Sequence, residues 1–217
     1  MKQLIILDLD GTLYNFDNSD SVNFTFSRFY IEIKKRVYSF LSKKLGMGED
    51  TARELYESVK TEFNGEVSLG LESKFGIDRY EFFGETWNLN PSQFIQRANR
   101  LPLIQSLNGT TAFLTSAPRV WASEVLKYLN LNDYQNRLFT GEPNIRKPNP
   151  IVFRQICDSF GFSPLETISV GDQVSTDITP AKSIGMKTVL VRGNSQEADY
   201  CINSVDELPE LLRRIII

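Results

Sequence analysis

The stretch Leu4-Ile5-Ile6-Leu7-Asp8-Leu9-Asp10-Gly11-Thr12-Leu13-Tyr14 decides the fold. Four consecutive apolar residues that end in two aspartates and a glycine predict a short strand buried on both faces, as at the centre of a parallel sheet. Asp8 and Asp10 then follow the carboxyl end of that strand, where open α/β sheets bind their ligands. Residues two apart on a strand point to the same side, and two converging carboxylates suit a hard cation better than an apolar core.

The overall composition limits the classes of protein that need to be considered. The 217 residues are 41% hydrophobic and 24% charged, which is ordinary for a soluble globular protein with an ample core. A net charge of −3 without a basic stripe argues against a nucleic-acid partner. Cys157 and Cys201 lie far apart and predict no disulfide framework.

The apolar runs also bear on the location of the protein. Each is too short for a membrane span, and Asp8 interrupts any signal-peptide pattern near the amino end. We therefore expect a cytoplasmic protein without a membrane partner, and the sequence leaves its oligomeric state open.

The complete absence of histidine is informative about catalysis and metal binding. It excludes catalytic triads that contain histidine and zinc sites that histidine ligates. With only two cysteines, any bound metal has to be held by oxygen ligands, which favours Mg²⁺.

A long helical segment follows the first strand. Apolar residues that recur every four positions predict a first helix that stops near Gly46: Phe29, Ile33, Val37, Leu41 and Leu45. A second helix is expected from Ala52 to Phe63, and two short helices lie between 66 and 89, the second starting at Asp78. A further helix is expected to open at Asn90-Pro91 and to continue to Ile104, with a kink or restart at Pro102.

From Asn108 onward, expected strands and helices alternate along the chain. The strands are expected at 111–115, 138–140, 167–170 and 187–191, and the helices at 118–130, 149–160, up to Gly185, and 205–216. This alternation predicts an α/β fold with a doubly wound parallel sheet and right-handed crossovers. The helical segment then becomes an insertion between the first two strands.

Asp8-Leu9-Asp10-Gly11-Thr12 resembles the first motif of the haloacid dehalogenase superfamily, whose members are mostly phosphatases. Three later segments resemble the other motifs of that superfamily in the same order: Ala112-Phe113-Leu114-Thr115-Ser116, Arg146-Lys147-Pro148-Asn149-Pro150 and Gly171-Asp172-Gln173-Val174-Ser175-Thr176-Asp177. Four motifs in order make chance a poor explanation. The resemblance implies a Rossmann-like catalytic core formed by residues 1–15 and 95–217, with a helical cap formed by residues 16–94.

The resemblance also implies roles for the motif residues. Asp8 is the nucleophile that forms a phospho-aspartate, and Asp10 is the general acid and base. Asp8, Asp172 and a main-chain carbonyl at Asp10 hold Mg²⁺, while Asp177 supports the site or positions Lys147.

The phosphate group has its own expected partners. A phosphate beside Thr115 and Ser116 would meet hydroxyls and N–H groups at the start of a helix, although these residues could also serve as an ordinary helix cap. Lys147 precedes a proline, which restricts its position, and the resemblance implies that it contacts the transferring phosphoryl oxygens.

These observations predict a magnesium-dependent phosphatase that acts on a small-molecule phosphomonoester, such as a nucleoside or sugar monophosphate. The cap layout and Leu13-Tyr14 are loosely similar to pyrimidine 5′-nucleotidase-like members. Dehalogenases of the superfamily generally lack the second aspartate, so Asp10 favours phosphate chemistry. A phosphomutase and a catalytically idle phosphate-binding protein remain the alternatives.

Overall fold

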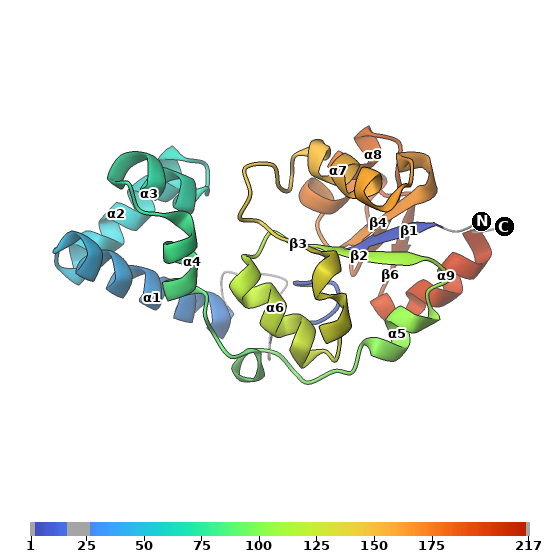
Figure 1. Cartoon of the computed structure of the whole chain (residues 1–217), viewed down its shortest axis with the longest axis horizontal. Coiled ribbons are helices and arrows are strands. Elements are labelled where there is room, and N and C mark those ends of the chain that lie inside the picture. Colours follow the sequence, from blue (N-terminus) through green and yellow to red (C-terminus); the bar gives the residue numbers. More distant parts are fainter. Residues whose placement is uncertain (1–2, 17–26, 216–217) are drawn as a thin grey trace. The chain divides into compact units, whose positions relative to one another are not determined.

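A computed structural model describes residues 3–16 and 27–215 of the chain. The chain divides into two compact units (Figure 1). One unit contains Met1–Asn15 and Ile95–Ile217, and the other contains Phe16–Phe94. Residues 17–26 of the expected cap lie outside the described residues.

The first unit is built on a parallel sheet whose central strand is β1. Among the described residues, six strands pair in the order β3-β2-β1-β4-β5-β6, and all the pairs are parallel. The strands are β1 (Leu4–Leu7), β2 (Thr110–Leu114), β3 (Leu138–Phe139), β4 (Thr167–Gly171), β5 (Lys187–Val191) and β6 (Tyr200–Ile202). The predicted doubly wound α/β fold is confirmed, and the order of strands changes direction between β1 and β4.

Helices cover both faces of this sheet (Figure 1). They are α5 (Leu101–Ser106), α6 (Arg119–Tyr128), α7 (Pro150–Phe160), α8 (Thr179–Ser183) and α9 (Leu208–Ile215). Leu4 and Ile6 of β1 pack with Phe153 and Ile156 of α7 and with Ala181 of α8 in one buried cluster. Because alternate residues of β1 face opposite sides, Ile5 and Leu7 are buried on the other face. β1 is thus enclosed on every side, which explains why its sequence is continuously apolar.

The second unit is a group of helices with its own core. Its helices are α1 (Arg28–Leu45), α2 (Glu49–Glu62), α3 (Val67–Phe75) and α4 (Arg79–Thr86). As the sequence predicts, α1 ends at Gly46, which adopts a φ of 66°, and the Asp78 side chain caps α4 by accepting from the Glu81 N–H. The fully buried Phe29 ring contacts the rings of Phe16, Trp87 and Phe94.

The prediction of a helix that opens at Asn90 is wrong over most of its length, although the expected restart at Pro102 is confirmed. A single 3-10 turn occupies Pro91–Gln93, and α5 starts only at Leu101, where Pro102 stands in the first turn. The apolar spacing that imitated a helix has another cause: the chain passes from one unit to the other here, with Phe94 buried in the helical unit and Ile95 in the sheet unit.

The edge strand β6 is absent from the sequence prediction. It has three residues, of which Cys201 is exposed, and it shows neither a long apolar run nor a clear alternation. β6 is held in the sheet by its backbone pairing with β5, and the pattern of its side chains contributes little to that pairing.

Within the described ranges, no helix combines the length and the apolar character that crossing a membrane requires.

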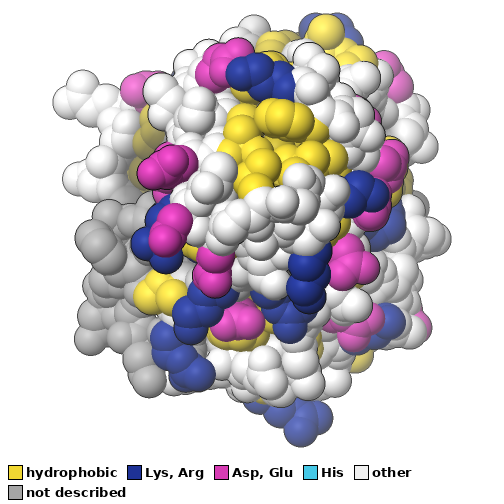
Figure 2. Space-filling model, turned by 90° about the vertical axis from the view of Figure 1, so that its left-hand side faces the viewer, with side chains coloured by type: hydrophobic (Ala, Val, Ile, Leu, Met, Phe, Trp, Pro, Cys, Tyr) yellow, Lys and Arg dark blue, Asp and Glu magenta, His cyan; other side chains and the backbone are white. Residues whose placement is uncertain are grey.

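Figure 2 shows one face of the molecule, on which acidic and basic side chains are interspersed around an apolar patch. Among the large apolar side chains that the helical unit exposes are Ile31, Leu69, Phe75 and Tyr80.

Two glycines of the helical unit offer a matched test of how tightly α3 packs on α2. A Cβ atom at Gly70 would lie 2.5 Å from Val59 Cγ1 and 2.7 Å from Phe63 Cδ2, whereas one at Gly84 of α4 would meet no atom within 4 Å. Gly84→Ala should therefore stabilise the protein by up to about 1 kcal/mol through helix propensity. Gly70→Ala should lose that gain to overpacking, which typically costs about 1–3 kcal/mol. Denaturant unfolding of both variants measures the difference, and equal stabilities would show that α2 and α3 can separate without cost.

Candidate active site

Asp8 stands where β1 ends, and the backbone around it is well held. Its N–H continues the pairing with β4 by donating to the Val170 carbonyl at 2.9 Å. The Thr12 hydroxyl donates to Asp8 Oδ2 at 2.9 Å. Between them, Gly11 adopts a φ of 87°, a conformation that favours glycine, so the chain turns sharply after the strand.

Lys147 connects Asp8 to Asp177 in a buried ion-pair chain. Its Nζ donates to Asp8 Oδ1 at 2.8 Å and also donates to Asp177 Oδ1. The side chains of Lys147 and Asp177 are each 2% exposed, and that of Asp8 is 8% exposed. The fixed position of the ammonium therefore depends on both carboxylates.

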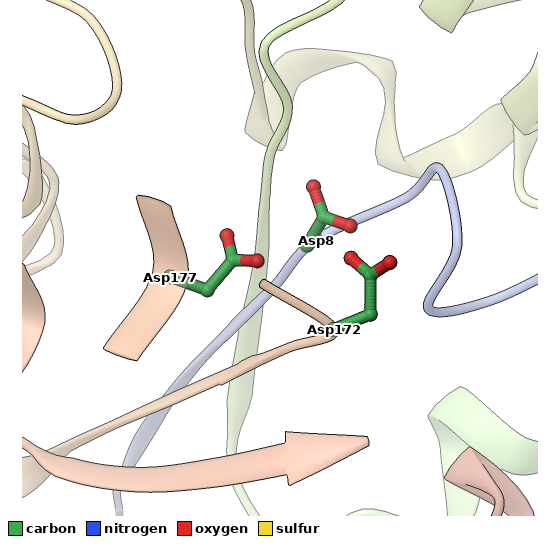
Figure 3. A group of neighbouring side chains, drawn as sticks. All are labelled: Asp8, Asp172 and Asp177. Atoms are coloured by element: carbon green, nitrogen blue, oxygen red, sulfur yellow. The ribbon is translucent and has the colours of Figure 1, made fainter. Parts of the chain in front are cut away.

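Asp172 completes a group of three carboxylates. Asp8 follows β1, Asp172 follows β4, and Asp177 comes from the helical turn Val174–Ile178, with their carboxyl groups converging (Figure 3). One oxygen from each lies within 4.8 Å of the oxygens from the other two. The group therefore lies where the strand order changes direction, between β1 and β4, which is the usual place for a ligand in this architecture.

The crowding of like charges shifts the protonation of this group. Burial, together with the charges of Asp177, Asp172 and Asp10, raises the pKa of Asp8 well above its ordinary value, although Lys147 opposes the shift. Burial and the charge of Asp177 raise the pKa of Asp172 to about 7. The pKa of Lys147 is raised, because the two carboxylates outweigh the effect of its burial. The site thus holds more negative charge than one ammonium neutralises.

The donor set fits a hard divalent cation. Asp172 Oδ1 is buried and accepts no hydrogen bond from the part of the chain that the structure describes. A buried carboxylate oxygen without a donor is costly, and a cation removes that cost. Asp8 and Asp172 are the better ligands, because Asp177 already accepts from Lys147 and, at 3.0 Å, from the Gln173 N–H. The three carboxylates therefore form a candidate metal site.

Asp10 is turned toward a different set of partners. The Thr115 hydroxyl donates to its Oδ2 at 2.8 Å, and the Trp121 Nε1–H donates to its Oδ1 at 3.0 Å. The Tyr14 hydroxyl also donates to Oδ1. Burial and the neighbouring Asp10 charge raise the pKa of Tyr14 well above its ordinary value, which keeps this phenol a donor.

The Thr115–Ser116 turn lies next to the loop after β3. The Thr115 N–H donates to the Phe139 carbonyl and the Gly141 N–H to the Ala117 carbonyl, each at 3.0 Å. The Thr115 hydroxyl also accepts from the Ala117 N–H, whereas the Ser116 side chain is exposed. Of the two expected phosphate ligands, Thr115 is thus bonded to Asp10 and Ser116 faces the solvent.

Two arginines bind the backbone of the loop that follows Asp8. Arg192, just after β5, donates to the carbonyls of Gly11 and Thr12 and to the Asn15 side chain. Arg100 donates to the Leu13 carbonyl at 2.7 Å. Each guanidinium satisfies carbonyls that the turn leaves without helical or sheet partners.

Most, but not all, of the residues that meet here were predicted from the sequence. Asp8, Lys147, Asp172 and Asp177 form one group, and Asp10 with Thr115 forms a second. Thr12, Tyr14, Trp121 and Arg192 were not predicted as site residues. Thr12 and Tyr14 belong to the quoted stretch, whereas the sequence offered only a core position for Trp121 and no signal for Arg192.

Comparison with known proteins places the chain in a family. The family model for haloacid dehalogenase-like hydrolases matches residues 2–185. The chain belongs to this family, and the predicted superfamily and hydrolase class are confirmed.

Individual relatives are phosphatases. The glyceraldehyde 3-phosphate phosphatase of Pyrococcus furiosus is 32% identical over 114 residues, 48% of this chain and 48% of that protein, so the match spans about half of the relative's length. The phosphoglycolate phosphatase of Neisseria meningitidis is 23% identical and matches 97% of this chain and 94% of its own. The crystal structure of a HAD phosphatase from Thermococcus onnurineus superposes with a TM-score of 0.67 and 25% identity over 98% of both chains.

Gly11 offers a test of how closely the turn after Asp8 approaches Asp172. A Cβ atom there would lie 2.2 Å from Asp172 Oδ2, whereas Gly161, with a φ of 73°, has no atom within 4 Å of such a Cβ. Both Gly→Ala variants should lose about 1–2 kcal/mol of stability, because each forces a left-handed conformation on alanine. Gly11→Ala alone should also lose hydrolase activity, since Asp172 has to move. Unfolding curves and activity assays on both variants check this, and an active Gly11→Ala protein would contradict it.

Proposed function

We propose that this protein is a Mg²⁺-dependent phosphatase that hydrolyses a small phosphate monoester through a phospho-aspartate on Asp8. The observation that carries the proposal is the buried Lys147 ammonium between Asp8 and Asp177. Beside it lies a buried Asp172 oxygen that accepts no hydrogen bond from any described residue. Such a site combines an anionic nucleophile with the positive charge that an anionic substrate needs.

The nucleophile is held for attack by its neighbours. Lys147 and Thr12 donate to the two oxygens of Asp8 and restrict the rotation of its carboxyl group. An Asp8 oxygen attacks phosphorus, the bond from phosphorus to the ester oxygen breaks, and the leaving alkoxide takes a proton from Asp10. Water that Asp10 deprotonates then attacks the phospho-aspartate, and inorganic phosphate leaves with the restored Asp8 carboxylate.

Mg²⁺, held by Asp8 and Asp172, would supply positive charge that offsets the repulsion between carboxylates and phosphate. Asp177 contributes by fixing the position of the Lys147 ammonium, because the lysine side chain is long and flexible and would otherwise have to be ordered when the substrate binds. We assign Thr115 and Ser116 to the phosphate oxygens, together with Lys147. In this assignment the Thr115 hydroxyl turns from Asp10 to the substrate when phosphate binds.

The names of the relatives guide the choice of substrate class. By their names, the two relatives described above act on glyceraldehyde 3-phosphate and on phosphoglycolate. A further relative, from Homo sapiens, is an N-acylneuraminate-9-phosphatase that is 32% identical over 111 residues. We therefore propose a phosphorylated sugar or small carboxylic acid as the substrate, and nucleoside monophosphates remain in the screen. We assign the helical unit, residues 16–94, as the cap that selects the leaving group.

Asp8→Asn tests the proposed nucleophile. An amide is a very poor nucleophile, so kcat for phosphate monoesters should fall by at least about 10³-fold while the fold is retained. The matched control is Asp158→Asn, which makes the same change at an exposed position of α7 and should keep full activity. A screen of sugar phosphates, phosphoglycolate and nucleoside monophosphates with purified protein provides the measurement. An Asn variant as active as the wild type, or a wild type that turns over none of these esters, contradicts the proposal.

Stability measured with and without Mg²⁺ tests the metal site. The pKa of Asp172 rises from 3.8 to about 7 on folding, so between these values the folded protein binds more protons than the unfolded one. Without metal, the contribution of this group to stability is therefore greatest at low pH and is lost as the pH rises through about 7. Because protons compete with the cation, Mg²⁺ should raise Tm more at pH 8 than at pH 5.

The matched variant for this measurement is Asp172→Asn. It should remove most of the extra stabilisation that Mg²⁺ gives at pH 8. Calorimetry gives four Tm values for each protein: in chelator and in Mg²⁺, each at pH 5 and at pH 8. An equal Mg²⁺ effect in the wild type and in Asp172→Asn would place the cation elsewhere.

A further inference from the structure

We propose that Tyr14 and Trp121 are positioning residues that hold the Asp10 carboxyl group where, in its protonated form, it protonates the leaving group. This inference rests on the proposed phosphatase function and assigns to it two residues that none of the four motif roles covers. Its basis is the hydrogen-bonded group formed by Asp10, Tyr14, Thr115 and Trp121.

The two side chains fix one oxygen of Asp10 from two directions. Trp121 Nε1 is 3.0 Å from Asp10 Oδ1 and 3.2 Å from the Tyr14 hydroxyl, which itself donates to the same Oδ1. Tyr14 comes from the loop after β1, and Trp121 comes from the first turn of α6. Contacts from two separate elements restrict both rotation and tilt of the carboxylate.

Burial makes these two partners rigid. Trp121 is 0% exposed and Tyr14 is 4% exposed, so neither side chain can turn away without disturbing the core. The backbone adds to this, because the Gly11 N–H donates to the Tyr14 carbonyl at 3.1 Å and closes the loop between Asp10 and Tyr14. An indole N–H can only donate, so Trp121 always presents a donor to Asp10.

Thr115 differs from these two partners. Its hydroxyl donates to Asp10 Oδ2 here, but the proposed mechanism uses the same hydroxyl for the phosphate. When that hydroxyl turns to the substrate, Tyr14 and Trp121 still hold Oδ1. They therefore keep Asp10 away from the Asp8–Asp172–Asp177 group at the stage when the leaving group needs its proton.

A purely structural role would have a different kinetic effect. If Tyr14 and Trp121 only satisfied a half-buried carboxylate, their loss would lower stability and slow all substrates alike. If they position the acid, their loss penalises alkyl esters, whose alkoxide leaving groups need a proton, more than nitrophenyl esters, whose phenolate leaves without one. The dependence on the leaving group thus separates the two roles.

The experiment measures formation of the phosphoenzyme in single turnover, because Asp10 also acts on water in the second step. The substrates are glycerol 2-phosphate and phosphoglycolate as alkyl esters and 4-nitrophenyl phosphate as the activated ester. The variants are Tyr14→Phe and Trp121→Phe, with Asp10→Asn as the reference for complete loss of the acid. Tyr134→Phe is the control. It removes a phenol hydroxyl from the same unit, where the Tyr134 ring packs on Phe113, and Asp10 accepts its described hydrogen bonds from Tyr14, Thr115 and Trp121 instead.

With either alkyl ester, Tyr14→Phe and Trp121→Phe should slow the first step by about 10- to 10²-fold, since a misplacement of about 1 Å costs up to about 10²-fold. The penalty with the nitrophenyl ester should be several-fold smaller, and Asp10→Asn should show the same contrast more strongly. The inhibition constant of inorganic phosphate should stay unchanged in both variants, and Tyr134→Phe should behave as wild type. Tyr14→Phe is nearly isosteric, so it carries the test even where Trp121→Phe folds poorly.

Equal penalties for both ester classes, or wild-type rates in Tyr14→Phe, would overturn the inference while leaving the phosphatase function intact. A weaker inhibition by phosphate would also overturn it, because Tyr14 would then act on phosphate binding. A wild-type protein that forms a phosphoenzyme from neither alkyl ester would overturn the proposed function and, with it, this inference.

Discussion

The ion pair between Lys147 and the carboxylates of Asp8 and Asp177 is the interaction on which the rest of the site depends. Taking three charged groups out of water is expensive, and the cost is recovered only where their positions are fixed and their hydrogen bonds are complete. The backbone is shaped to allow this. A Cβ atom at Gly171 would lie 2.2 Å from Asp177 Cγ, so only glycine lets β4 pass this close to the carboxylate. Asp172 then brings a negative charge that Lys147 does not balance, and this excess makes the site receptive to a cation.

The topology of the sheet explains how residues so distant in sequence come together. Leu7 of β1 pairs with Phe113 of β2 on one side and with Val170 of β4 on the other. The residues that follow these three strands, among them Asp8, Thr115 and Asp172, therefore emerge at one edge of the sheet. Lys147 reaches the same edge from the segment before α7.

Much of this arrangement was predictable from the sequence, because its signals are local. An apolar run followed by aspartates identifies β1 and Asp8, and the alternation of strands and helices indicates that the later motifs meet it. The partners of Asp10 were not predictable in this way. Trp121 has the spacing of an ordinary core residue on α6, and only its 3.0 Å contact shows that its N–H serves a carboxylate. The false helix after Asn90 has a similar origin, because Phe94 and Ile95 are apolar for two different cores, which periodicity cannot distinguish.

The arginine contacts to the loop after Asp8 have a consequence for the order of events during synthesis. The ribosome makes Asp8 before it makes Arg100 and Arg192, which hold the loop that follows Asp8. β1 itself lacks a neighbour on one side until Thr167–Gly171 has been made. A nascent chain therefore carries the Asp8 carboxylate long before it can hold that carboxylate in place. The segment from Thr167 onward, and not Asp8 itself, therefore determines when this edge of the sheet is complete.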